Sequence, residues 1–198
     1  MACLIQLTHY NILNAIIDLS DNLDIMTFRI SEEQVRNSGA QAFDVSAKWP
    51  PEIPLMRQMP IQLVGFPEFL REIDYAAPLV SCGTYQALTL VEDYNDREII
   101  VIYDPKQSQG APRLLPLGLN MSGCSGGPAI IHRTQNSIHR WYPVGLIAGG
   151  PRGQGEGESA SYDTIRIRRI DCIDPNGHIR VPDTGWLPPR RGTIEILV

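Results

Sequence analysis

Met121-Ser122-Gly123-Cys124-Ser125-Gly126-Gly127-Pro128 is the stretch of sequence that decides the fold. A serine inside a glycine-rich turn has an exposed hydroxyl, and the amides of its neighbours are free to bind an oxyanion. The next residues, Ala129 to Ile131, are apolar and favour a strand, and the chain returns as a second apolar run from Tyr142 to Gly150. The pattern therefore predicts that Ser125 lies on an exposed turn between two strands.

The composition favours short strands over long helices. Sixteen prolines and seventeen glycines are spread along the 198 residues, and 43% of the residues are apolar. Such a composition is typical of many strands joined by turns around a sizeable core, so we expect an all-β protein. The net charge of −5 gives no electrostatic footprint for a nucleic acid or an anionic membrane. We therefore expect neither of these partners.

The apolar segment from Ala2 to Leu19 does not have the pattern of a targeting or membrane segment. It lacks a basic beginning and is interrupted by polar residues such as Gln6 and Asn11. It is therefore neither a secretory signal nor a membrane span. We predict a cytoplasmic protein.

The cysteines and the glycine-rich loop give no sign of a metal or a cofactor. The four cysteines are widely spaced and form no C-x-x-C pair, which predicts free buried thiols and no metal site. They are Cys3, Cys82, Cys124 and Cys172. Residues 149–157 have the composition of a loop and no strand-to-helix context, so we predict no nucleotide and no other cofactor.

The turn Gly123-Cys124-Ser125-Gly126-Gly127-Pro128, followed by the strand Val144-Gly145-Leu146-Ile147, resembles the nucleophile region of trypsin-like (chymotrypsin-fold) serine proteases. The resemblance implies that Ser125 is the nucleophile. It also implies an oxyanion hole formed by the backbone N–H groups of Gly123 and Ser125. The family carries an aspartate before the serine, which pairs with the N-terminus freed by cleavage. Cys124 cannot form that ion pair, so this route of activation is not expected.

The same resemblance implies where a substrate binds. Ala148, Gly149 and Gly150 would pair with the substrate backbone as an added strand. Leu119, six residues before the serine, occupies the position of the pocket floor and offers no carboxylate to a Lys or Arg side chain. We therefore expect the residue before the cleaved bond to be apolar or small.

The resemblance implies that the other two members of a catalytic triad, a histidine base and an aspartate, lie upstream of Ser125. Residues 23–30 alternate as a half-buried strand entered through Asp24, and this form is similar to the family segment that supplies the triad aspartate. Asp24 is thus the candidate that orients the base; the alternative is that it ends a turn with Ser20, Asp21 and Asn22. His9 is the only histidine upstream of Asp24 and the candidate base.

His9 has an alternative interpretation, because it lies inside an apolar run and close in sequence to Asp24. It is then a strand histidine with a satisfied hydrogen bond. His132, His139 and His178 match no family position. A Cys124 nucleophile is a further alternative, although the register of the turn directs Ser125 outward.

The order of segments predicts a chymotrypsin-like double antiparallel β-barrel whose N-terminal barrel is incomplete. We assign residues 1–35 to a remnant of that barrel, 36–60 to a proline-rich linker and 61–198 to a C-terminal barrel that carries the serine motif. A partner or a missing segment would cover the open edge. Strands are expected at Pro60–Pro67, Leu79–Val91, Glu98–Tyr103, near Tyr162 with a short helix before Ile173, and at Thr193–Val198.

The predicted function is that of a trypsin-like serine endopeptidase, which hydrolyses a peptide or protein substrate through an acyl-enzyme on Ser125. The chain as given is nevertheless expected to be inactive or nearly so, because His9 is expected on the strand that leads to Asp24 and not at a turn facing Ser125. The alternative is a non-catalytic module that binds extended peptides by strand addition. A third interpretation, an α/β-hydrolase elbow matching G-x-S-x-G, fails because no helix follows the turn.

Overall fold

The computed structural model describes residues 2–6, 12–38, 49, 55–74, 79–103, 122–150 and 163–182. The strands are β1 (Ala2–Gln6), β2 (Ile16–Ser20), β3 (Ile25–Phe28), β4 (Pro60–Gly65), β5 (Arg71–Asp74), β6 (Leu79–Gly83), β7 (Tyr85–Tyr94), β8 (Glu98–Tyr103), β9 (Pro128–Gln135), β10 (Ile138–Gly149) and β11 (Asp163–Arg169). The helices are α1 (Glu32–Ser38) and the 3-10 turns η1 (Ile12–Ala15) and η2 (Glu68–Leu70). Within these ranges no helix is long and apolar enough to cross a membrane.

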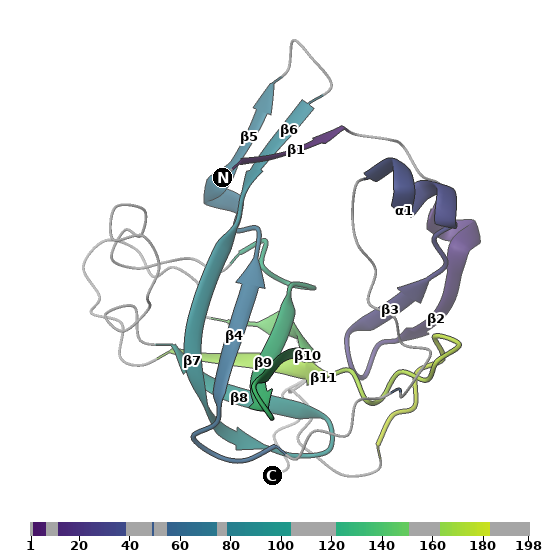
Figure 1. Cartoon of the computed structure of the whole chain (residues 1–198). Coiled ribbons are helices and arrows are strands. Elements are labelled where there is room, and N and C mark those ends of the chain that lie inside the picture. Colours follow the sequence, from purple (N-terminus) through teal and green to yellow (C-terminus); the bar gives the residue numbers. More distant parts are fainter. Residues whose placement is uncertain are drawn as a thin grey trace, which may run out of the picture.

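Six of the strands form a closed antiparallel barrel in the order β10-β11-β8-β7-β4-β9 (Figure 1). The strands β4, β7 and β8 are neighbours in the barrel, and β9 returns to lie beside β4, which is a Greek-key connection. In the closed sheet every strand has a neighbouring strand on both sides. The expectation of an all-β protein with an antiparallel barrel in its C-terminal part is therefore confirmed.

The barrel interior is filled by residues that alternate along the strands, as a period of two requires. On β4, Ile61 and Leu63 are fully buried, and on β11, Ile165 and Ile167 are fully buried. The same clustered core includes Val91, Ile99, Val101, Ala129, Ile131, Val144 and Ile147. The β-branched side chains pack well on a pleated surface, which is why this composition forms strands.

The described N-terminal residues form two small sheets outside the barrel. The strands β2 and β3 pair as a hairpin, and β1 joins β6 and β5 in a sheet of three strands (Figure 1). The expected boundary between residues 35 and 36 falls inside α1, and β4 begins at Pro60, where the expected linker ends. The strand expected at residues 193–198 lies outside the described residues.

A buried ion pair joins the barrel to the β2–β3 hairpin. Glu98 on β8 is fully buried, and Arg168 on β11 is 3% exposed and donates to its carboxylate. Nε of Arg168 also donates to the carbonyl of Leu23, in the hairpin turn, at 2.8 Å. Arg166 reaches the other oxygen of Glu98 at 3.7 Å. One arginine therefore neutralises a buried carboxylate and holds the hairpin against the barrel wall.

The segment after β11 completes this contact. The short helix expected before Ile173 is wrong: residues 170–172 form a turn, and Ile173 bridges to Ile179. The expected turn Asp174-Pro175-Asn176-Gly177 is confirmed, since the amide of Gly177 donates to the carbonyl of Asp174 at 2.9 Å. The helix before Ile173 does not form because Ile173 and Ile179 pack against Leu23 and Ile25 of the hairpin, and this packing overrides the helical spacing of the isoleucines.

The ion pair gives a prediction about stability. Arg168→Met leaves the charge of Glu98 buried and only weakly compensated by Arg166, so we expect the free energy of unfolding to fall by about 3–5 kcal/mol in urea titrations. Because apolar replacement of a buried pair is often nearly neutral, the double variant Glu98→Leu/Arg168→Met should recover most of the loss. Wild-type stability in the single variant would show that the pair does not hold the fold.

Candidate active site

Ser125 lies on the turn that enters β9, and this turn is held by backbone hydrogen bonds to β10. The amide of Gly126 donates to the carbonyl of Ile147 at 2.8 Å, and the amide of Ile147 donates to the carbonyl of Gly127 at 2.9 Å. Within the turn, the amide of Gly127 donates to the carbonyl of Cys124 at 2.9 Å. Ser125 itself is exposed. The predicted display of an exposed serine on a turn is therefore observed, and the turn leads directly into β9.

Two of the glycines in this turn are required by its geometry. Gly123 has a φ of 86°, in the left-handed region, and a Cβ there would lie 2.8 Å from the backbone nitrogen of Glu68. At Gly127 a Cβ would lie 2.1 Å from the carbonyl oxygen of Val64 on β4. The turn therefore packs against the end of β4 more closely than any residue with a side chain allows.

The segment after β4 orients one of the proposed oxyanion donors. The amide of Glu68 donates to the carbonyl of Ser122 at 2.8 Å. Because a trans peptide points its C=O and N–H in opposite directions, the N–H of Gly123 points away from Glu68. No hydrogen bond within the described part of the chain uses the amide of Gly123 or of Ser125. Both amides thus remain available to an oxyanion.

Glu68 contributes a second contact that the sequence did not reveal. The hydroxyl of Ser122 donates to Oε2 of Glu68 at 3.0 Å, so backbone and side chain of Glu68 both hold the residue before Gly123. The only signal in the sequence is that Glu68 follows the strand-ending segment Gly65-Phe66-Pro67. The segment after β4 and the serine turn are far apart in sequence, so a local sequence pattern could not predict their contact.

Cys124 and Ser125 are adjacent in sequence but have opposite environments. The side chain of Cys124 is buried in the barrel core, and this burial raises the pKa of its thiol to about 11. A thiol attacks as the thiolate, so Cys124 is nearly all protonated and unreactive at neutral pH. Its neighbour Ser125 is exposed. The geometry therefore favours the serine as nucleophile.

At the end of β10, no strand among the described residues pairs with the side that faces the serine turn. Its pairing with β9 ends at Leu146 opposite Pro128, whereas Gly149 still pairs with Arg166 on β11. A Cβ at Gly149 would meet no atom of the described residues within 4 Å. Ala148 and Gly150 flank it and are partly buried.

Asp24 is the one other triad candidate among the described residues, and it is not joined to Ser125. Asp24 ends the turn between β2 and β3 with a φ of 54° and an exposed side chain. No hydrogen bond or ion pair among the described residues joins it to the serine. His9 and Leu119 lie outside the described residues. His178 lies in the turn after β11, where its Nδ1 is 3.8 Å from Oδ2 of Asp18.

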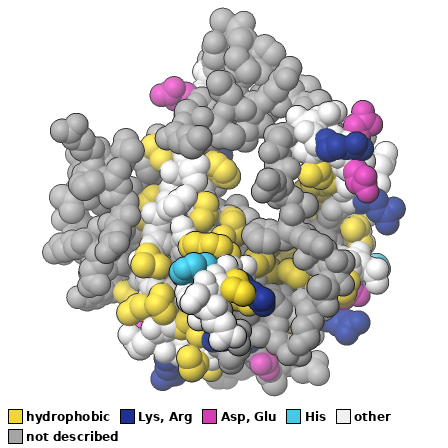
Figure 2. Space-filling view, in the orientation of Figure 1, with side chains coloured by type: hydrophobic (Ala, Val, Ile, Leu, Met, Phe, Trp, Pro, Cys, Tyr) yellow, Lys and Arg dark blue, Asp and Glu magenta, His cyan; other side chains and the backbone are white. Residues whose placement is uncertain are grey.

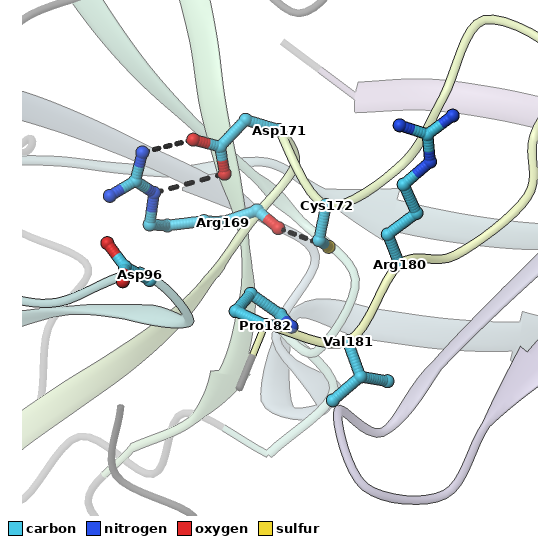
Figure 3. Close-up of a pocket in the computed structure, with 7 residues that line it drawn as sticks. All are labelled: Asp96, Arg169, Asp171, Cys172, Arg180, Val181 and Pro182. Atoms are coloured by element: carbon cyan, nitrogen blue, oxygen red, sulfur yellow. Dashed lines mark hydrogen bonds and ion pairs between the residues drawn. The ribbon is translucent and has the colours of Figure 1, made fainter. Parts of the chain in front are cut away.

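A cavity of about 220 Å³ lies elsewhere, between the β7–β8 turn and the segment after β11 (Figure 3). Its charged groups are already paired: Arg169 binds Asp171, and its Nη1 donates to the carbonyl of Asn95 at 2.9 Å. The thiol of Cys172 donates to the carbonyl of Arg169 at 2.9 Å. None of the candidate site residues that the structure describes lines this cavity.

Comparison with known proteins finds no match: no family model, no curated protein and no solved structure matches the chain. The function of the site is therefore inferred from its own residues and geometry.

The environment of Cys124 predicts its reactivity. At pH 8, well below the thiol pKa of about 11, iodoacetamide should leave Cys124 unmodified in the folded protein and modify it after denaturation. Peptide mapping by mass spectrometry measures both states. Rapid alkylation of Cys124 in the native protein would restore the cysteine as a candidate nucleophile.

Proposed function

We propose that the chain is a trypsin-like serine endopeptidase whose nucleophile is Ser125. The observation that carries the proposal is that this exposed serine lies beside two unused backbone amides, on a turn whose Ser122–Gly123 peptide is oriented by Glu68. The Greek-key order of the barrel, with the turn directly before β9, supports the same assignment. A chymotrypsin-like arrangement is the fold that this proposal implies.

The chemistry assigned to the turn is acyl transfer. The hydroxyl oxygen of Ser125 attacks the carbonyl carbon of the peptide bond while its proton passes to a base. The carbonyl oxygen becomes negative and accepts hydrogen bonds from the amides of Gly123 and Ser125. The base returns its proton to the leaving amine, and water then hydrolyses the acyl-enzyme. By resemblance the base is His9, oriented by Asp24.

The substrate is proposed to be an extended peptide or protein segment. No strand among the described residues pairs with one side of β10 at Ala148 and Gly149, and with Gly150, which follows the strand, they offer backbone donors and acceptors to an added strand. No atom of the described residues lies within 4 Å of a Cβ position at Gly149, which leaves room for a substrate side chain. With Leu119 at the implied pocket floor, the preferred side chain is apolar or small.

A second candidate function is peptide binding without cleavage. The observation that favours it is the position of Asp24, which is exposed on a hairpin turn and makes no hydrogen bond or ion pair with Ser125 among the described residues. A serine hydroxyl without a base stays protonated and is a weak nucleophile. In this case the same side of β10 still binds an extended peptide, and the turn has no catalytic role.

Covalent labelling tests the proposal. An intact site should react with a fluorophosphonate probe, and Ser125→Ala should abolish the labelling because the attacking oxygen is gone. Ser137→Asn is the matched control: it removes another exposed serine and keeps a residue that tolerates the φ of 62° at that position. Labelling that survives in Ser125→Ala contradicts the assignment, and an unlabelled wild-type protein that binds extended peptides supports the second candidate.

A pair of glycine variants tests the oxyanion donors. Gly123→Ala forces the turn away from Glu68, since its Cβ would lie 2.8 Å from that residue's nitrogen, and should slow labelling by about 10²–10³-fold. Gly126→Ala is the control, because Gly126 has a similar φ of 82° but open space around its Cβ position. Equal rates in the two variants would show that the amide of Gly123 is not a donor.

A further inference from the structure

One face of the β9–β10 hairpin carries four side chains that the proposed function does not use. The register pairs His132 with Trp141 and Thr134 with His139. Because side chains alternate along a strand, these residues share one face of the hairpin. We call them the histidine–tryptophan face. His132, His139 and Trp141 are exposed, and Figure 2 shows histidine beside hydrophobic side chains in the region of β9 and β10.

The two histidines are close enough to share a ligand. Nε2 of His132 lies 3.1 Å from Nδ1 of His139. Two nitrogens that bind one metal ion at about 2.0–2.1 Å, with an angle between a right angle and the tetrahedral one, lie about 2.9–3.4 Å apart. The observed separation falls within this range. Thr134 adds an uncharged hydroxyl oxygen 3.1 Å from the same nitrogen of His139.

The surroundings hold the two rings in place. The ring of Trp141 lies 4.5 Å from that of His132, centroid to centroid, and packs against it. The hairpin is paired along both strands from Ile138 opposite Gln135 to Tyr142 opposite Ile131, which fixes the spacing of the two histidines. Arg133 lies opposite Arg140 in the register, one position along the hairpin from the histidines. Because side chains alternate along a strand, the two arginines point to the opposite face.

We infer that the histidine–tryptophan face binds a divalent first-row transition-metal ion through Nε2 of His132 and Nδ1 of His139. Both rings are neutral when bound, and the hydrogen between the two nitrogens moves to the other nitrogen of its own ring. Imidazole ligands suit Zn²⁺, Ni²⁺ and Cu²⁺, whereas Mg²⁺ and Ca²⁺ prefer oxygen. No third histidine, cysteine or carboxylate joins the pair within the described residues, so water fills the remaining positions.

This site is separate from the proposed active site. His132 lies four residues beyond Pro128, where β9 begins, which corresponds to roughly 13 Å of extended strand beyond the serine turn. Metal binding is therefore expected to leave fluorophosphonate labelling of Ser125 unchanged. Failure of one proposal leaves the other intact.

Trp141 provides a direct readout of binding. We expect NiCl₂, added to the untagged full-length protein after removal of chelators, to quench tryptophan emission until one ion is bound. The quenching should be lost in His132→Gln and in His139→Gln, because each removes one of two ligands. Trp141→Phe should lose most of the quenching signal, since the two other tryptophans, Trp49 and Trp186, lie outside the hairpin.

Two controls make the result specific. His178→Gln removes another exposed histidine and should quench like the wild type, and MgCl₂ should have no effect on any variant. Circular dichroism checks that the variants are folded, which is expected because the altered side chains are exposed. Identical NiCl₂ titration curves for the wild type, His132→Gln and His139→Gln would overturn the proposal.

Discussion

The pairing of β4 with β9 is the constraint on which the rest of the structure depends. Gln62 lies opposite Ile130 and Leu63 opposite Ala129, and these contacts close the barrel. Closure gives every strand a neighbouring strand on both sides and encloses the apolar side chains of six strands. It also fixes the site, because the segment after β4 carries Glu68 and the turn before β9 carries Ser125. The same pairing therefore makes the core and sets the geometry of the candidate oxyanion donors.

A second constraint, the ion pair of Glu98 and Arg168, connects the barrel to the N-terminal hairpin. Both charges are buried, so each one stabilises the fold only because it neutralises the other. Removing either partner would leave an unpaired buried charge, which is costly. Arg168 also binds the carbonyl of Leu23, so that placement of the hairpin is coupled to neutralisation of Glu98. The hairpin is further attached where Asp18 accepts the amide of Ile179, a bond that lowers the pKa of the Asp18 carboxyl.

Some described residues of the candidate site could be predicted from the local sequence, and others could not. The glycines around Ser125 were informative because positive φ values and close backbone approach leave almost no other residue possible, as at Gly123 and Gly127. Glu68 was not found, because its contact with Ser122 joins residues 54 positions apart. Asp24 had two interpretations that share one local composition, because the position of a carboxylate relative to a base is a tertiary property; the structure places Asp24 at the end of the hairpin turn.

By itself, the sequence determined the all-β class, the strands at 60–65 and 98–103, and the exposed serine turn. Each of these depends on interactions between near neighbours: alternation, turn chemistry and glycine conformation. Only the tertiary structure decided the closing partner of β4, the helix that does not form before Ile173, and the approach of His132 to His139. These depend on burial and on register between distant strands, and the free energy of such contacts is set by neighbours that the local sequence does not contain.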